Sequence, residues 1–370
     1  MAGLHRHHRD PFANLRMNIA RPNRAALIAA SLFLAAGARA AQYAYVANSG
    51  SNSISQYTIG PGGRLVPMAT PAVEAGRVPR AIAIDPSGRY AYVTNYGGGT
   101  VSQFTIGADG ALKPMDLPTV PAGINPTGIV VDASAKSVYV TNAGGGSVSQ
   151  YAIGADGALA PIGRRYTLAG NTPTALAIDA SNDHAYVANQ GANTISQFAI
   201  AGGGTLLPMG APMVATGSGP GSIALDSGGH HAYVTNVGSN TVSQYDIGPG
   251  GSLAPMNPAT VATGSAPYFI RLAPSGKYAY VANNAGSTIS QYRVGADGAL
   301  SPLDPAEIAT GNSPIAIDID PSGKYLYAAN NGSGTLSCYA IGRDGKLAPM
   351  NTPTESAQSF PTFVATLQGR

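Results

Sequence analysis

A repeat of 47 residues runs through the chain without insertion or deletion, and it constrains the fold more than any other feature. We call a set of positions spaced by this step a column. One column holds the asparagine that ends a Tyr-Val-Thr-Asn-like segment, and another holds a proline. The asparagines are Asn48, Asn95, Asn142, Asn189, Asn236, Asn283 and Asn330, and the prolines are Pro79, Pro126, Pro173, Pro220, Pro267, Pro314 and Pro361. A fixed period in the 40s is typical of propellers and solenoids, so the seven copies predict seven equivalent structural units.

Each copy predicts four short strands, as the residues after Pro79 illustrate. The first strand (residues 81–84) ends at an Asp-Pro-Ser-Gly turn, and the second (residues 90–93) alternates β-forming side chains. A glycine-rich loop leads to the third strand (residues 101–106), and an Asp-Gly hairpin leads to the fourth. The proline in the Ala-Leu-x-Pro-Met segment of the fourth strand fits only at a sheet edge. We therefore expect the fourth strand to be outermost and the first to be innermost.

Seven four-stranded sheets arranged radially make an all-β fold, a seven-bladed β-propeller of antiparallel blades, over residues 41–370. This part of the chain begins with a second strand (residues 42–48) and finishes with a first strand (residues 360–367). The C-terminal strand should therefore close the ring as the innermost strand of the blade that residues 43–74 begin. Pairing the two ends removes free sheet edges, which favour aggregation.

Residues 1–40 predict a secretory signal peptide. Two arginines precede an apolar run (residues 25–36), and an Ala-Arg-Ala cleavage site follows at residues 38–40. The apolar run is too short to span a bilayer. Met17 is a possible true start, because it would give a leader of ordinary length. We therefore expect an exported protein, periplasmic or secreted, with no transmembrane segment.

The leader also explains the formal charge of +3. It holds six of the 21 basic residues and one of the 18 acidic residues, which leaves 15 basic against 17 acidic residues in the rest of the chain. No cluster of Lys and Arg remains to neutralise phosphates. Nucleic acid is therefore not an expected partner.

The repeats offer no pattern for metal or cofactor chemistry. No Cys/His spacing fits zinc, no Gly-Lys-Ser/Thr run fits a phosphate loop, and the Asp-Gly pairs fit hairpins before calcium ligands. We expect neither a metal nor a cofactor. The single cysteine, Cys338, lies in a column otherwise occupied by Gln56, Gln103, Gln150, Gln197, Gln244 and Gln291. Divergence at a strand position explains this cysteine better than a reactive thiol does.

The Tyr-Val-Thr-Asn segments (residues 92–95, 139–142 and 233–236) and the Asp-Pro-Ser-Gly-(Arg/Lys)-Tyr turns (residues 85–90 and 320–325) resemble those of the YVTN-repeat propellers and of the wider seven-bladed lactonase family. That family includes 6-phosphogluconolactonases and fungal muconate-lactonising enzymes. The resemblance extends over the whole predicted propeller. It implies the propeller fold, and for active members it implies His, Glu and Arg side chains that project into one mouth of the channel.

The His and Glu residues of the predicted propeller fall outside its inner strands. They lie around the ends of fourth strands (Glu74, Glu307 and Glu355), at the starts of second strands (His184 and His231) and in a turn (His230). A lactonase needs a base or a polarising group beside the ring carbonyl. No position of this sequence receives the catalytic residues that the resemblance implies, so the catalytic residues stay unknown.

Opposite charges replace small residues in one inner-strand column. The column holds Ala83 in the second copy, but Arg271 in the sixth and Asp318 in the seventh. Equivalent places on neighbouring inner strands predict an ion pair near the channel. Two interpretations stay open: a structural pair between blades, whose attraction offsets its desolvation, or a pair that anchors a ligand.

A second group of outliers gathers at the loops that lead into the inner strands. The column after the repeat proline holds the large residues Arg80 and Tyr268, and Phe269 and Phe360 lie next to that column or its proline. Tyr96 directly follows an asparagine of the repeat. Aromatic and Arg side chains are the usual anchors of recognition sites. These residues, with the pair of Arg271 and Asp318, are the candidate ligand-binding residues. Packing of the individual loops is the alternative.

Two functions follow from these observations. The first is an exported, monomeric propeller that acts as a binding or scaffold module through one face and the central channel, toward a protein, glycan or small-molecule ligand. The alternative is a lactonase-like hydrolase of the 6-phosphogluconolactonase type, which acts on a sugar lactone at the channel mouth with Arg side chains and channel waters.

The Ala-Arg-Ala site predicts that the exported protein begins at Ala41. Intact-mass spectrometry of the exported product should show the loss of residues 1–40. A product that retains its leader would contradict the prediction of export by this signal.

Overall fold

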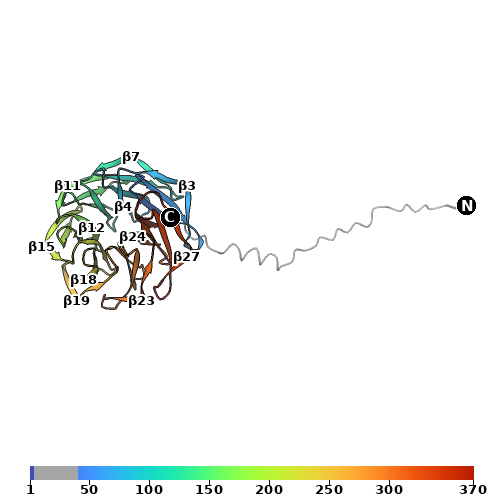
Figure 1. Cartoon of the computed structure of the whole chain (residues 1–370). Helices are drawn as coiled ribbons and strands as arrows, with labels where there is room; N and C mark the ends of the chain where they lie inside the picture. The colour runs from blue at the N-terminus through green and yellow to red at the C-terminus, as the bar shows by residue number, and fades with distance from the viewer. Residues whose placement is uncertain (4–40) are drawn as a thin grey trace. The chain divides into compact units, whose positions relative to one another are not determined.

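The computed structural model describes residues 1–3 and 41–370, so the expected signal peptide lies outside the described residues except for its first three. Residues 41–370 form a compact unit of seven four-stranded antiparallel sheets, which confirms the predicted seven-bladed propeller. In Figure 1 the labels of outer strands lie on the periphery of a ring, and β4, β12 and β24 lie near its centre. Seven strands that contact one another in a closed circle line the channel.

The bounds of the strands follow the repeat. The inner strands are β4 (Pro79–Ile84), β8 (Pro126–Val131), β12 (Pro173–Ile178), β16 (Pro220–Leu225), β20 (Pro267–Leu272), β24 (Pro314–Ile319) and β28 (Pro361–Gln368). The second strands are β1 (Gln42–Asn48), β5 (Tyr90–Asn95), β9 (Ser137–Asn142), β13 (His184–Asn189), β17 (His231–Asn236), β21 (Tyr278–Asn283) and β25 (Tyr325–Asn330). The third strands are β2 (Ser53–Ile59), β6 (Thr100–Ile106), β10 (Ser147–Ile153), β14 (Thr194–Ala201), β18 (Thr241–Ile247), β22 (Thr288–Val294) and β26 (Thr335–Ile341). The outer strands are β3 (Leu65–Glu74), β7 (Leu112–Pro121), β11 (Leu159–Leu168), β15 (Thr205–Ala215), β19 (Leu253–Ala262), β23 (Leu300–Ala309) and β27 (Leu347–Ser356), and a 3-10 turn, η1 (Pro61–Gly63), precedes β3.

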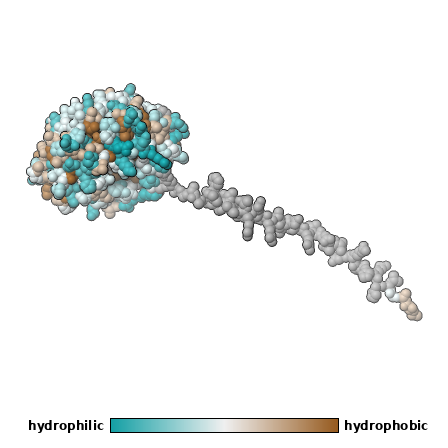
Figure 2. Space-filling view, turned by 90° about the horizontal axis from the view of Figure 1, so that it is seen from below, coloured by the Kyte–Doolittle hydropathy of each residue, from teal (hydrophilic) through white to brown (hydrophobic). Residues whose placement is uncertain are grey.

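We number the blades in chain order. Blade 1 contains β28, β1, β2 and β3, blade 2 begins with β4, and blade 7 begins with β24. The outer strands are longer than the Ala-Leu-x-Pro-Met segment suggests, because each bulges opposite the glutamine column and then pairs again with its third strand. The surface of the propeller shown in Figure 2 carries scattered groups of apolar side chains among polar ones.

Aspartates hold the turns between the first and second strands. The carboxylate of Asp85 accepts hydrogen bonds from the backbone N–H groups of Arg89 (2.8 Å) and Tyr90 (2.6 Å). Gly88 in the same turn has a φ of 65°, which glycine adopts without steric cost. The Asp-Pro-Ser-Gly sequence thus folds locally into the turn that the sequence predicts, and it delivers the chain from the channel to the second strand.

Buried tyrosines connect each blade to the next. The hydroxyl of Tyr92 donates to the backbone carbonyl of Gly157 in the next blade at 2.7 Å. Six further tyrosines donate to the equivalent carbonyl, namely Tyr45, Tyr139, Tyr186, Tyr233, Tyr280 and Tyr327. Burial raises the pKa of Tyr139 to about 12, so its hydroxyl remains a donor at neutral pH.

A glutamine column makes a second set of bonds between blades. The side-chain oxygen of Gln103 accepts the backbone N–H of Leu159 at 2.7 Å, and its amide nitrogen donates to the carbonyl of Leu117 in its own outer strand at 2.8 Å. The six glutamines of the column all make the bond to the next blade. Cys338 takes the seventh place, between blades 7 and 1, and it packs in an apolar cluster with Leu65. Burial, with the charge of Glu355 as a smaller cause, raises the pKa of its thiol to about 12, which argues against a reactive cysteine.

The predicted closure of the ring is confirmed. β28 pairs antiparallel with β1, with Gln368 opposite Gln42 and Val364 opposite Val46. The hydroxyl of Tyr327 in blade 7 donates to the carbonyl of Gly63 in blade 1 at 2.7 Å, and this bond also joins the two ends of the ring. Both ends of the described propeller therefore lie in one sheet.

Deletion of residues 359–370 should remove β28 and leave the inner edge of β1 without its partner. We expect a large fall in soluble yield or in melting temperature, because an unpaired edge and an open ring favour aggregation. Circular dichroism melts and size-exclusion chromatography would measure it. An unchanged melt would show that the ring closes without β28.

Replacing Cys338 with Gln should stabilise the propeller, because it restores the bond between blades that the other six junctions have. A hydrogen bond of this kind contributes about 1 kcal/mol to the free energy of unfolding. The matched variant Gln103→Cys should destabilise by a similar amount. Chemical denaturation of both variants tests this, and a destabilised Cys338→Gln protein would mean that the apolar cluster around Cys338 rejects the larger side chain.

Candidate functional site

The main cavity is the central channel, with a volume of about 660 Å³. Residues of all seven inner strands line it, together with Ala180, Asp226 and Pro274 from the turns that follow three of these strands. The channel therefore opens toward the face that carries the turns between first and second strands. We call this opening the turn mouth.

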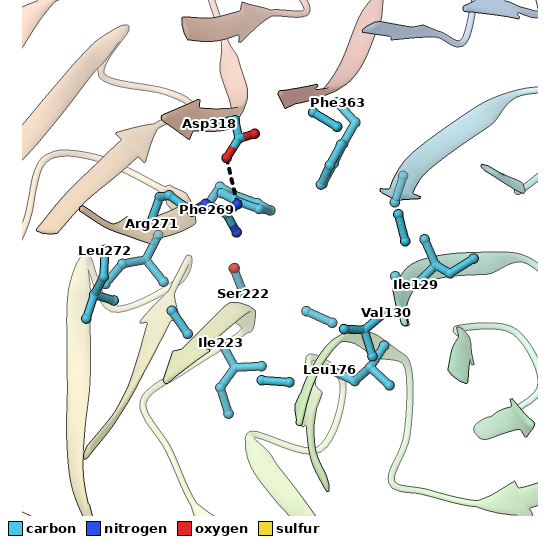
Figure 3. A pocket seen from close by; sticks show the side chains of 18 of the residues that line it. Ile129, Val130, Leu176, Ser222, Ile223, Phe269, Arg271, Leu272, Asp318 and Phe363 are labelled. Atoms are coloured by element: carbon cyan, nitrogen blue, oxygen red, sulfur yellow. Dashed lines mark ion pairs between the residues drawn. The ribbon is translucent and has the colours of Figure 1, made fainter. Parts of the chain in front are cut away.

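Small side chains in two lining columns make room for this cavity. One column contributes Ala81, Gly128, Ala175, Ser222, Phe269 and Phe363, and the other contributes Ala83, Val130, Ala177, Ala224, Arg271, Asp318 and Ala365. Figure 3 shows Phe269, Arg271, Asp318 and Phe363 on one side of the cavity and Ile129, Val130, Leu176 and Ile223 on the other. At the level of these residues the cavity is therefore two-sided, with charged and aromatic groups opposite aliphatic ones, and Asp226 adds a carboxylate from the turn after β16.

The predicted ion pair of Arg271 and Asp318 is present. A guanidinium nitrogen (Nη2) of Arg271 lies 2.8 Å from Oδ1 of Asp318, and the pair joins blades 6 and 7 (Figure 3). The other oxygen, Oδ2, accepts the backbone N–H of Thr366 at 2.7 Å and its hydroxyl at 2.9 Å. The Asp318 side chain is 6% exposed and that of Arg271 is 51% exposed. The carboxylate is thus fixed and buried, whereas much of the guanidinium faces the cavity.

Two phenylalanines separate the main cavity from a smaller space. Phe269 and Phe363 meet edge to face, with ring centroids 5.5 Å apart, and both line both spaces. The smaller space has a volume of about 80 Å³, and residues at the starts of the inner strands line it. The channel therefore narrows at the phenylalanine pair, between the turn mouth and the opposite end.

Arg80 crosses that opposite end. Its Nη2 donates to the hydroxyl of Tyr268 at 2.5 Å, although β4 and β20 are not neighbours in the ring. Its guanidinium carbon also lies 6.0 Å from the ring centroid of Tyr96 and 5.9 Å from that of Tyr268, within the range of cation–π attraction. Arg80, Tyr96 and Tyr268 are therefore brought together, but they engage one another across the narrow end.

The candidate residues do not form one site. Arg271 and Asp318 lie in the main cavity, Phe269 lies at its narrow boundary, and Arg80 and Tyr268 lie beyond it. Phe360 lines neither space; it is 55% exposed, and its ring lies over Gly50. The candidate ligand-binding residues thus lie in two separate regions, apart from the isolated side chain of Phe360.

The histidines have structural partners on the turns. The Nδ1 of His184 lies 2.8 Å from a carboxylate oxygen of Asp179, and the His184 ring covers Gly251 of the next blade. His231 makes the same contacts with Asp226 (3.1 Å) and Gly298. Burial alone would raise the pKa of Asp226, but hydrogen bonds from the backbone and ring of His231 and from the backbone of His230 lower it overall. These rings occupy the place that tyrosine fills in four other blades and Ser137 fills in blade 3.

Two site residues escaped the sequence analysis. Phe363 is the second large residue in the column of Phe269, so comparison within that column could have found it. Thr366 is the only polar residue in a column that otherwise holds Ile84, Val131, Ile178, Leu225, Leu272 and Ile319. Thr366 contacts Asp318 between blades 1 and 7, and this contact exists only in the closed ring.

The arrangement can bind an anion more readily than it can activate water. An arginine has five N–H donors, and the Asp318 carboxylate occupies only one side of this guanidinium. Both oxygens of Asp318 already accept hydrogen bonds or an ion pair, and the cavity lining contains no His or Glu. Within the described residues there is no cluster of three or more metal-binding side chains, and no helix there is long and apolar enough to cross a membrane.

Solved structures share this fold over most of the chain. A periplasmic gluconolactonase from Pseudomonas aeruginosa is 19% identical, with a TM-score of 0.75, covering 89% of this chain and 100% of that one. A candidate 6-phosphogluconolactonase from Bacteroides uniformis is 20% identical, with a TM-score of 0.78, covering 89% and 100%. A protein from Lactobacillus plantarum is also 20% identical, with a TM-score of 0.76, covering 89% and 99%.

Among curated proteins, none matches this chain. The family described as "Lactonase, 7-bladed beta-propeller" matches residues 35–124 and 98–366. These two overlapping matches span nearly all of the propeller, and the protein therefore belongs to the seven-bladed β-propeller lactonase family.

Proposed function

We propose that this protein is an exported binding module that holds a small anionic molecule in the main cavity, with Arg271 as the anchor. The observation that carries the proposal is the half-exposed side chain of Arg271 inside a cavity of about 660 Å³. Cavities of this size are typical of small-molecule sites.

The neighbours of Arg271 prepare it for this role. Asp318, itself held by Thr366, holds one side of the guanidinium in place, so less side-chain freedom is lost when a ligand binds. The remaining donors match the two oxygens of a carboxylate. The ligand enters by the turn mouth, because the phenylalanine pair narrows the channel and Arg80 crosses its other end.

Export is part of the same proposal. Its support is the order of basic residues, apolar run and Ala-Arg-Ala site in residues 1–40. The periplasmic gluconolactonase of Pseudomonas aeruginosa offers a precedent for this fold in an exported protein. The location would be the periplasm or the medium.

Hydrolysis of a sugar lactone is the second candidate function, and membership in the lactonase family favours it. Arg271 would polarise the ring carbonyl and stabilise the oxyanion that water addition creates. Asp318 is a poor base in this arrangement, because Thr366 and Arg271 already engage its oxygens. Asp226, the other carboxylate of the lining, already contacts His230 and His231 through its two oxygens, so a channel water would need activation by the substrate itself or by a backbone group.

Arg271→Ala should weaken the binding of a carboxylate ligand by roughly tenfold or more, since hydrogen bonds to charged groups contribute about 1.5–3 kcal/mol. Calorimetry with sugar acids, phosphorylated sugars and simple lactones measures the affinity, and a hydrolysis assay runs on the same panel. The double variant Arg271→Ala with Asp318→Ala introduces the small residue that the column prefers. It should fold and still fail to bind.

Arg64→Ala serves as the control, because Arg64 is exposed on a hairpin away from the channel. Its binding should equal that of the wild type. Lactone turnover that disappears in Arg271→Ala would replace the binding-module proposal with the hydrolase. The absence of both binding and turnover in the wild type would overturn both small-molecule functions.

A further inference from the structure

The outer strand of blade 3, β11, differs from the other six outer strands in its prolines. β11 contains one proline, whereas each of the others contains at least two. Arg165 takes the place of the second proline, in the column of Pro71, Pro118, Pro212 and Pro353. As a result, β11 has a run of seven residues without proline, 162–168. The longest such run in any other outer strand is four residues.

This difference matters because outer strands are sheet edges. β11 pairs with β10 on one side and has no strand on the other. A proline at an edge withholds the N–H that an added strand would need, which is one way in which proteins block pairing with foreign chains. β11 keeps every N–H of a stretch as long as an ordinary strand.

The bulge of β11 also departs from the repeat. In five of the six glutamine-bearing blades the glutamine amide donates to a backbone carbonyl of the bulge. In blade 3, Gln150 donates instead to the hydroxyl of Thr167 at 2.9 Å, and Gly163 has a φ of 51°. The backbone around Arg164 therefore follows a path that the other blades do not share.

β11 presents apolar side chains and the basic side chain of Arg164 to solvent. Tyr166 is 50% exposed and Leu168 is 75% exposed. The neighbouring outer strand β15 adds Met213, at 52%. β11 carries two arginines and no acid, β15 carries no charged residue, and within the described residues Arg164 forms no ion pair.

We propose that β11 is a docking edge for an extended, acidic peptide segment of a partner protein, which adds to blade 3 as a fifth strand. Backbone hydrogen bonds supply affinity in strand addition, and side chains of alternate residues supply specificity. The net positive charge of β11 favours glutamate or aspartate in the added strand, and apolar residues of that strand would cover Tyr166 and Leu168. A second copy of the chain is a poorer occupant, because two such edges would bring like charges together.

The test uses a fluorescent synthetic hexapeptide of alternating glutamate and valine, and the same peptide with lysine in place of glutamate. Fluorescence anisotropy should give a dissociation constant on the order of 10–100 μM for the glutamate peptide, in low salt, and much weaker binding of the lysine peptide. Hydrogen exchange of the complex should slow at the amides of residues 163–168.

Arg165→Pro places the proline of the column in β11 and should weaken binding of the glutamate peptide by more than tenfold, and a circular dichroism melt checks that the variant folds. The double charge reversal Arg164→Glu with Arg165→Glu should also weaken binding of the glutamate peptide, although it keeps all backbone N–H donors. Arg343→Glu, at an exposed hairpin of blade 7, is the matched charge control and should bind normally.

Equal binding of the two peptides, full binding by Arg165→Pro, or protection at strands other than β11 would each overturn the proposal. So would the absence of glutamate-peptide binding to the wild type at millimolar concentration. None of these outcomes depends on the channel, so the test is independent of the ligand that Arg271 binds.

Discussion

The propeller depends on bonds that each blade makes to the next. A buried tyrosine hydroxyl in the second strand reaches the backbone carbonyl of a glycine in the neighbouring hairpin, and this bond recurs at all seven junctions. The acceptor must be glycine for two reasons: Gly110 has a φ of 79°, and a Cβ there would lie 2.4 Å from the ring of Tyr43. The glycine of the hairpin and the tyrosines of the second strand therefore depend on each other.

These contacts leave the residues of the inner strands free to vary. The tyrosine and glutamine bonds between blades come from the second and third strands, so the columns that face the channel need only be small enough to let seven strands meet. Within that limit, blade 6 could acquire Phe269 and Arg271, and blade 7 could acquire Asp318, without any loss of the tyrosine bonds. Binding specificity and ring stability therefore depend on different columns of one repeat.

The sequence predicted what is periodic, because each periodic residue serves the same contact in every blade. It identified the strand order, the closure by the C-terminal strand and the pairing of Arg271 with Asp318, since these follow from register alone. It did not predict that Arg80 and Tyr268 cross the channel, because residues on opposite sides of a ring share no register relation. Nor did it separate Phe360 from the channel, since the direction of a loop side chain depends on local contacts such as that with Gly50.

The bonds that the second-strand tyrosines make between blades all run in one rotational sense. Tyr92 donates forward to Gly157, Tyr139 donates forward to Gly204, and no blade returns the same bond to the one before it. Such a head-to-tail interface behaves like that between subunits of a cyclic oligomer, where the rotation at each contact decides whether the array closes or continues as an open spiral. The number of blades is then a property of this single interface: a chain with six or eight copies of the repeat could close only by altering the angle at every tyrosine.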